Sequence, residues 1–367
     1  MRASVIPNTA NTCADVTSST NYTPVGVQLF PDGTSKTTAS DGTYASARWA
    51  NSNPGTKSFV DTPPTGYILT LACYNTTSQP AYASGYTATL PTGETLTWQL
   101  GYTAGVGWFQ AQGGDVYAAS TLRSYIPVGA VGGRYFVGNG STGGMPGVVT
   151  FGATYDFDNT AANGAGYVST KNWLVNESQS ATDFYSVMYH RLGSPTVADF
   201  SGDTTLNAKL TSKADPYYVD GNLTIDTADW LVGNNETITV LVNGNLTINR
   251  RVNISGTGFV AFIVNGTITI GSDVGTTSTS ATPVIEGIYI TSPAGSFRTS
   301  ASTTAAARRF VGKGTFIAGT FTLERDLDAD TRNIDYAAEL FIYNPELMLR
   351  MPDKMKDLPV SWQEVAP

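Results

Sequence analysis

Three near-copies of one phrase decide the fold of this chain: YVDGNLTI at residues 218–225, VLVNGNLTI at residues 240–248 and FIVNGTITI at residues 262–270. Each copy has Asp-Gly or Asn-Gly between apolar residues, which is the strongest short-range signal for a β-hairpin. The spacing argues against that interpretation. Equivalent positions lie 23 residues apart between the first two copies and 22 between the last two, and a fixed period of this size is typical of a stacked solenoid.

The phase of the apolar residues supports the solenoid. In a two-residue hairpin, the residues that flank the turn face each other, so Val242 would lie opposite the polar Asn245, and the other two copies give the same mismatch. If the chain instead continues through the corner, Val242, Leu246 and Ile248 all point to one side. We therefore predict a parallel β-helix in which each copy forms the same corner of a successive turn.

Successive turns of such a coil lie about 4.8 Å apart and pair as parallel strands. Asn243 and Asn265 are expected to stack at the corner, because Asn tolerates left-handed backbone angles and its amide can bond to neighbouring turns. Two further turns are predicted: EGIYITS at 286–292, with Ile288 and Ile290 inward, and FIAGTFTL at 316–323, with Ile317, Gly319, Phe321 and Leu323 in the same phase.

The β-helix domain is expected to span residues 104–367. The segment 107–127 resembles an earlier turn, at the start of the same coil. An inserted excursion follows at about 127–214, and a C-terminal capping segment is expected at about 340–367. Within the excursion, SATDFYSVMYHRLG at 180–193 predicts one short helix, capped by Ser180 or Thr182 and stopped by Gly193, that would shield apolar surface of the coil.

Residues 22–103, after an N-terminal extension at 1–21, show short alternating segments separated by turn signals, which predicts an antiparallel, immunoglobulin-like β-sandwich. DGTY at 41–44 follows the first strand, and PTGY at 64–67 precedes a core strand. With these phrases the region resembles the prealbumin-like or Cna-B-type domains of bacterial surface proteins. The predicted fold class of the whole chain is therefore all-β: a sandwich followed by a parallel β-helix.

A wider resemblance lies in LGYTAGVGWFQAQGGDVYA at 100–118, in the coil phrases, and in the ending AELFIYNPELMLRMPDKMKDLPVSWQEVAP at 338–367. On these stretches the chain resembles uncharacterised bacterial cell-surface proteins of the candidate-phyla type with a C-terminal β-helix. The resemblance implies an exported protein displayed at the cell surface. It implies no assigned catalytic activity.

The composition agrees with export. Charged residues make up 14% of the 367 residues, against roughly 25% in ordinary soluble domains. A surface built from Ser, Thr, Asn, Gln and Tyr is typical of extracellular β-proteins. The net charge of -8 provides no basic footprint for nucleic acid. No apolar run is long enough to cross a bilayer or to form a signal peptide, so we expect the chain to be a processed portion of a longer product.

The two cysteines, Cys13 and Cys73, lie in the N-terminal quarter. In an exported protein a Cys13–Cys73 disulfide would pin the N-terminal segment onto the sandwich. The alternative is that they are two unrelated small apolar residues.

Few residues suggest chemistry. His190, the one histidine, has no motif-placed nucleophile or second histidine, so a structural role is favoured. The alternate acids Asp326, Asp328 and Asp330 resemble the start of a calcium loop. The expected glycine and glutamate of such a loop are replaced by Thr331 and Ala337, which leaves a solvated acidic turn as the alternative to calcium. No other cofactor or metal is predicted.

We therefore expect a non-enzymatic, extracellular structural protein: a self-assembling subunit of a surface layer, fibre or stalk. A β-helix ends in unpaired strand edges, so the expected partners are further copies of the chain, joined through the β-helix ends and the N-terminal segment. The first alternative is an adhesin or carbohydrate-binding module with glycans as partners. The second is a polysaccharide-active β-helix enzyme, although the outward positions Asn243, Asn245 and Thr247 cannot act as acid or base.

Overall fold

The structure is a computed structural model. It describes the strands within residues 2–104 and, beyond them, residues 107–124, 126, 136–138, 147–157, 174–177, 182–301, 308–327, 332–333 and 335–356. The chain divides into two compact units, the first mainly residues 1–106 and the second mainly residues 107–126, 132–327 and 337–367. None of the described helices is long and apolar enough to span a membrane.

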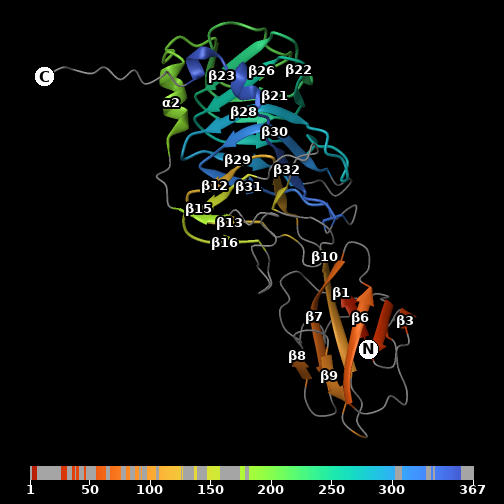
Figure 1. Cartoon of the computed structure of the whole chain (residues 1–367). Coiled ribbons are helices and arrows are strands. Elements are labelled where there is room, and N and C mark those ends of the chain that lie inside the picture. The colour runs from red at the N-terminus through yellow and green to blue at the C-terminus, as the bar shows by residue number, and fades with distance from the viewer. Residues whose placement is uncertain are drawn as a thin grey trace, which may run out of the picture. The chain divides into compact units, whose positions relative to one another are not determined.

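The first unit contains two β-sheets, with strand orders β4-β5-β1-β10-β7-β8 and β3-β2-β6-β9 (Figure 1). Neighbouring strands are antiparallel, except that β1 and β10 are parallel. Ala72, Cys73 and Leu100 are buried. The strands are β1 (Arg2–Val5), β2 (Gly26–Phe30), β3 (Ser35–Thr37), β4 (Ala39–Ser40), β5 (Ala45–Ser46), β6 (Gly55–Thr62), β7 (Tyr67–Asn75), β8 (Pro80–Tyr82), β9 (Thr87–Leu90) and β10 (Thr97–Ala104).

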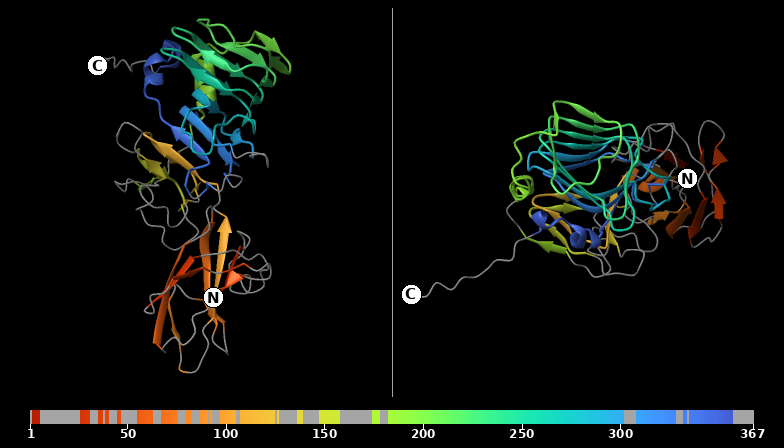
Figure 2. Two further views of the ribbon diagram at one scale, coloured as in Figure 1. Left: turned by 90° about the vertical axis from the view of Figure 1, so that its right-hand side faces the viewer. Right: turned by 90° about the horizontal axis from the view of Figure 1, so that it is seen from above.

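The second unit is a parallel β-solenoid, seen from the side in Figure 1 and from above in Figure 2. Its long sheet has the order β14-β11-β32-β30-β28-β26-β23-β20-β18, and its second sheet the order β19-β21-β24-β27-β29-β31. The long sheet comprises β11 (Phe109–Gln112), β14 (Val137–Gly138), β18 (Phe200–Ser201), β20 (Tyr217–Asp220), β23 (Thr237–Val242), β26 (Phe259–Val264), β28 (Ile285–Thr291), β30 (Phe310–Ile317) and β32 (Glu339–Ile342). The second sheet comprises β19 (Thr204–Leu206), β21 (Leu223–Ile225), β24 (Leu246–Ile248), β27 (Ile268–Ile270), β29 (Ser296–Thr299) and β31 (Thr320–Leu323).

Shorter ladders complete the turns, and their strands also pair in parallel. They are β12 (Val116–Ala118), β15 (Val149–Phe151) and β17 (Leu174–Asn176) in one ladder, β13 (Leu122–Arg123) and β16 (Tyr155–Asp156) in another, and β22 (Trp230–Val232) and β25 (Val252–Ile254) in a third.

The three repeated phrases stack as predicted. Val219, Val242 and Val264 are neighbours on successive strands of the long sheet, and Leu223, Leu246 and Ile268 are neighbours on the second sheet. Together with the other inward residues they form one buried core inside the coil. The chain therefore continues through each corner, and the hairpin alternative is excluded.

Glycines form a column at the same corner. A Cβ atom at Gly244 would lie 2.4 Å from the carbonyl oxygen of Gly221, and one at Gly221 would lie 2.4 Å from that of Gly202. The column continues through Gly266 and Gly295, where a Cβ would lie 2.7 Å and 2.2 Å from the carbonyl oxygen of the preceding glycine. Corner backbones therefore approach so closely that no side chain fits.

The predicted phase of the fourth turn is wrong. Ile288 and Ile290 point outward, whereas Tyr289 points into the coil beside Phe262, with ring centroids 5.5 Å apart. All residues of β28 are buried, because both faces of this strand are covered, so its apolar pattern does not reveal which face is inside. In the fifth turn Ile317 also lies on the outer face, whereas Leu323 packs against the inner core.

Two short helical segments and α2 (Phe184–Arg191) cover the outer face of the long sheet. α2 packs on β26 and β28. Leu347 of α3 (Glu346–Arg350), Met355 of η3 (Asp353–Met355) and Met351 between them belong to the same apolar cluster. This cluster includes Met188 of α2, as the predicted shielding role requires. The cap is Asp183, which accepts a hydrogen bond from the Ser186 backbone N–H at 3.0 Å, rather than Ser180 or Thr182.

The order of turns along the coil differs from the order in the sequence. β11 pairs with β32, the last strand, and on its other side with β14. The turns of residues 107–177 therefore extend the coil beyond its C-terminal strand, and the chain begins its other run of turns at β18. The segment 107–127 is thus a turn of the coil, but not at the start that we predicted. Much of the expected excursion at 127–214 is itself coil, since it contains β14 to β19.

Candidate functional site

Polar side chains follow the corners of the coil in two ladders. In the first, Asn243 donates from Nδ2 to Asp220 Oδ1 at 3.0 Å, and Asn265 donates to Asn243 Oδ1 at 3.1 Å. The predicted corner stack of these two asparagines is confirmed. The Asn243 amide donates to one turn and accepts from the next, so the ladder adds side-chain hydrogen bonds to the backbone pairing.

The second ladder runs through Asp203, Asn222, Asn245 and Thr267. Asn222 Nδ2 donates to Asp203 Oδ1 at 2.9 Å, and Asn245 Nδ2 donates to Asn222 Oδ1 at 3.0 Å. The Thr267 backbone N–H then donates to Asn245 Oδ1 at 2.8 Å. Both ladders begin with an aspartate near the β18 end of the coil. A carboxylate accepts hydrogen bonds but has no N–H to pass to a further turn, so it ends the ladder.

Next to the second ladder, a column of threonines crosses the second sheet. Thr205, Thr224, Thr247 and Thr269 are direct neighbours in register on β19, β21, β24 and β27. Core residues flank Thr224, Thr247 and Thr269 on both sides, and Leu206 follows Thr205, so the hydroxyls point outward. Within the described part of the chain, none of these four side chains makes a hydrogen bond.

We call the outward surface of these four strands the polar face. It has three columns of short side chains: Asp203, Asn222, Asn245 and Thr267 in the first, Thr205, Thr224, Thr247 and Thr269 in the second, and Asn207, Asp226, Asn249 and Gly271 in the third. On the next strand the threonine column is interrupted by Arg298, which pairs with Glu324 through Nε and Oε2 at 2.7 Å. The polar face is thus bounded by an ion pair.

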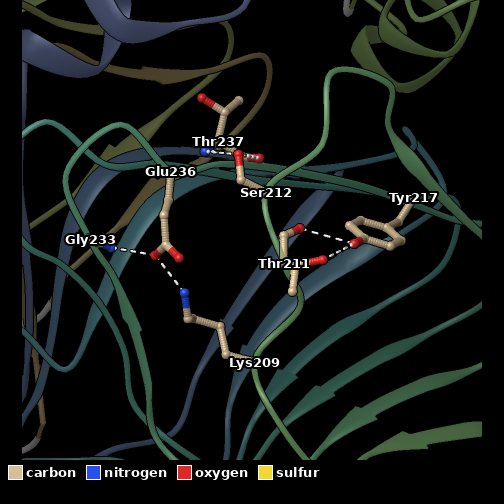
Figure 3. A network of polar contacts seen from close by, with 7 residues as sticks. All are labelled: Lys209, Thr211, Ser212, Tyr217, Gly233, Glu236 and Thr237. Carbon is tan, nitrogen blue, oxygen red and sulfur yellow. Dashed lines mark hydrogen bonds and ion pairs between the residues drawn. The ribbon is translucent and has the colours of Figure 1, made fainter.

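A network of polar contacts covers the end of the coil at the β18 turn (Figure 3). Lys209 Nζ lies 2.5 Å from Glu236 Oε2, which also accepts from the Gly233 backbone N–H at 2.6 Å. The hydrogen bond from Lys209, followed by that from Gly233, lowers the pKa of Glu236. Ser212 Oγ accepts from the Thr237 backbone N–H at 2.8 Å and donates to its carbonyl at 3.1 Å, so a side chain replaces strand pairing there.

The same end turn carries a second group of contacts. Lys213 Nζ lies 2.7 Å from Asp199 Oδ1 and 4.0 Å from the centre of the Tyr217 ring. Burial raises the pKa of Asp199, but hydrogen bonds from Lys213 and the Tyr218 backbone outweigh it, and the net shift is downward. Beneath this polar layer Leu206 and Leu210 close the core. The end turn therefore has the polar outer layer of a capping repeat.

A buried arginine holds the start of the Ser/Thr-rich loop between β27 and β28. Arg325 donates from Nη2 to the carbonyls of Gly271 at 2.6 Å and Val274 at 3.1 Å, while its Nε has no hydrogen-bond partner. Nearby Glu339 Oε1 accepts from the Arg325 backbone N–H at 2.7 Å and from Thr299 Oγ1 at 2.9 Å. Burial raises the pKa of Glu339 to about 8 and lowers that of Arg325 to about 10. Both side chains are enclosed in the coil, so their role is structural.

The predicted calcium and disulfide sites are only partly within the described residues. Asp326 follows β31 in the second unit, while Asp328 and Asp330 lie outside the described residues, so the calcium site stays a prediction. In the described part of the chain, no three His, Cys, Asp or Glu side chains gather in a group that could hold a metal ion. Cys73 is buried in β7. Cys13 lies outside the described residues, so the Cys13–Cys73 bridge also stays a prediction.

His190 lies exposed near the end of α2. Its Nδ1 is 3.1 Å from Ser194 Oγ, and its ring packs edge-on against Tyr189, with centroids 5.8 Å apart. Ser194 follows the last turn of the helix, so both contacts hold the imidazole at the helix end, and among the described residues no carboxylate pairs with the imidazole.

Sequence reasoning missed the pairs Lys209–Glu236 and Arg325–Glu339. Each joins residues on different turns, outside the regular repeat, where spacing gives no register. Three members of the threonine column are visible in the sequence as the middle Thr of LTI or ITI, whereas Thr205 lies in TTL and is not. These threonines entered the prediction only as evidence against acid–base chemistry.

The fold and these surfaces define a parallel β-solenoid protein with a capped end and an ordered polar side. Comparisons with protein-family models, with curated proteins and with solved structures find no match to the chain.

Proposed function

We propose that this protein is an extracellular structural protein, a non-catalytic subunit of a bacterial cell-surface layer, fibre or stalk. The observation that carries the proposal is the regular coil, in which backbone pairing, a glycine column and two asparagine ladders hold one corner of successive turns together. Such a coil resists bending and unfolding, which suits a load-bearing or spacing element. The outward positions of two successive turns, Asn243, Asn245 and Thr247 on one and Asn265, Thr267 and Thr269 on the next, do not transfer protons.

We also propose that the two N-terminal sheets are the layers of a β-sandwich of the prealbumin-like or Cna-B type. Buried Ala72 and Leu100, neighbours on β7 and β10, support a core on one face of the first sheet. A sandwich of this kind would attach or space the coil at the surface.

Copies of the chain are proposed to associate, but not through the β18 end. There Leu206 and Leu210 are covered by charged and hydroxyl side chains, and both ladders end in aspartates. A second coil stacked on this end would have to strip water from these ion pairs and from the ladder aspartates, which is costly. Contacts between subunits are therefore assigned to the other end, to the sides of the coil or to the N-terminal segment.

Negative-stain electron microscopy of the purified chain tests assembly, with light scattering after gel filtration as the second measurement. Filaments or sheets that persist on dilution support the proposal. A single monomeric species at high concentration, with no ordered assembly in the microscope, would overturn it. The proposed surface location is tested separately, by asking whether protease added to intact cells of the source organism cleaves the protein.

A second candidate function is a glycan-binding or adhesive module. The specific observation in its favour is the polar face, where four threonine hydroxyls in register have no partner in the described part of the chain.

A further inference from the structure

The polar face is a regular lattice of hydrogen-bonding groups. Its threonine rows repeat once per turn, so that Thr224, Thr247 and Thr269 lie about 4.8 Å apart along the coil axis. Along each strand, alternate outward residues are separated by about 6.6 Å. A ligand that uses several rows at once must itself repeat at close to the same interval.

The hydrogen-bonding capacity of the face is mostly unused. The ladder amides satisfy one another through one N–H each, and an Asn side chain has a second N–H to offer. The threonine hydroxyls can both donate and accept, and no described side chain or backbone group occupies them. The face therefore presents donors and acceptors together, in rows, to whatever lies on it.

The charge of the face selects the class of ligand. Asp203 and Asp226 are its two charged members and lie in the flanking columns, so the threonine column between them is uncharged. Nucleic acid would require cations to replace its counterions. A protein partner would require an apolar centre, which interfaces normally have and which this face, lined by Thr, Asn and Asp, does not offer. An uncharged polymer rich in hydroxyl groups fits both the charge and the bonding pattern.

We propose that the polar face binds an uncharged, extended polysaccharide that lies along the coil axis and places one sugar on each turn. Extended β-1,4-linked glycans advance per sugar by a length close to the spacing of neighbouring strands, so successive sugars meet successive threonines. Each contact is weak, and affinity arises because several contacts form at once. This inference deepens the second candidate function and holds whether or not the chain assembles.

The test uses the full chain and a variant with Thr224→Val, Thr247→Val and Thr269→Val. Valine has nearly the shape of threonine and a high strand propensity, so the variant removes hydroxyls while preserving the sheet. A matched control carries Thr277→Val, Thr279→Val and Thr282→Val in the loop before β28, where three exposed threonines lie off the face. Circular dichroism and thermal unfolding establish that both variants remain folded.

Binding of cellohexaose and mannohexaose, two uncharged β-1,4-linked probes, is measured by isothermal titration calorimetry, with cellobiose as the short probe. We expect the hexasaccharides to bind more tightly than the disaccharide, because only the longer chains span several rows. The face variant should bind about tenfold more weakly or worse, whereas the loop control should match the parent chain.

Absence of binding to both hexasaccharides would overturn the proposal, as would equal binding by the parent chain and the face variant. If the face variant loses assembly in the electron microscope while the parent chain binds no glycan, the face belongs to a contact between copies instead. Electron microscopy measures assembly and calorimetry measures glycan binding. The assembly proposal and the glycan proposal can therefore fail independently.

Discussion

At the scale of single residues, the coil depends on corner positions that exclude a side chain. At Gly244 a Cβ would lie 2.4 Å from the Gly221 carbonyl oxygen, which is backbone and cannot move without shifting its turn. Gly244 is not among the glycines with positive φ, so space rather than backbone angle requires glycine here.

We predict that Gly244→Ala destabilises the chain by about 2–3 kcal/mol, as overpacked positions do. The matched control is Gly233→Ala, because a Cβ there would meet its nearest neighbour, Glu236 Oε2, at an ordinary 3.5 Å. Urea unfolding monitored by circular dichroism measures both. Equal stability of the two variants would show that the corner can relax.

For the corner asparagines Asn243 and Asn265, the sequence predicted the stacking but not its physical cause. Their stacking followed from the 22-residue period and is confirmed, but the role of left-handed angles is wrong. Positive φ among the described non-glycine residues occurs at Ser194 and Asn235, not at Asn243 or Asn265. The amide ladder, rather than backbone geometry, explains asparagine at this corner.

Glu339 should make stability depend on pH. Burial raises its pKa to about 8 from an ordinary 4.5, so between these values the folded chain keeps a proton that the unfolded chain has released. The stability that Glu339 contributes is therefore full below about pH 4.5 and is lost as the pH rises towards 8. Glu339→Gln retains an acceptor for Thr299 and Arg325 but cannot ionise.

We expect the variant to lose less stability than the parent chain between about pH 5 and about pH 8. Urea unfolding across this range measures the difference. The positive charge of Arg325 and the negative charge of Asp326 act on the same carboxyl group in opposite directions, so only the difference between variant and parent is interpreted. Parallel pH profiles would contradict a proton held by Glu339.

At the scale of elements, the fold was predictable where the period was unbroken and not where it was interrupted. The strands around 218–270 keep 22 or 23 residues per turn, and every predicted pairing there is confirmed. The loop before β28 changes the number of residues per turn. Because β28 is apolar on both faces, its register could not be recovered from alternation, and Ile288 and Ile290 were assigned to the wrong side.

The helix α2 was predictable as an element, but its first residue was not. Several residues before it can cap a helix, and only the structure distinguishes them. Asp183 accepts from the Ser186 hydroxyl at 2.6 Å and from its backbone N–H at 3.0 Å, and these two hydrogen bonds lower the pKa of Asp183.

We predict that Asp183→Ala costs about 1 kcal/mol of stability through loss of the cap. Thr182→Ala, which replaces a residue that the sequence offered as the cap, should have little effect. Thermal unfolding at neutral pH compares the two. A larger loss for Thr182→Ala would assign the cap to threonine.

At the scale of the whole molecule, the sequence order hides the order of turns. A turn of a solenoid can stack on any turn of similar shape. When a long segment joins two runs of turns, the sequence does not say which turns are neighbours. The resemblance of 107–127 to a turn was therefore correct, while its position was wrong: β11 adds to the edge that β32 would otherwise leave unpaired. The polar face and the end cap could not be placed before this order was known.

Cross-linking can test this order directly. Gln112 and Ile342 are paired neighbours on β11 and β32, so their Cα atoms lie about 5 Å apart, within the range that a disulfide spans. Replacing both with cysteine should give a 112–342 disulfide under mild oxidation, detected as a linked peptide by mass spectrometry. The control joins Gln112→Cys with Ser201→Cys on β18, at the opposite end of the long sheet, and should give no link. Absence of the 112–342 link under conditions that oxidise the free thiols would show that β11 does not lie beside β32.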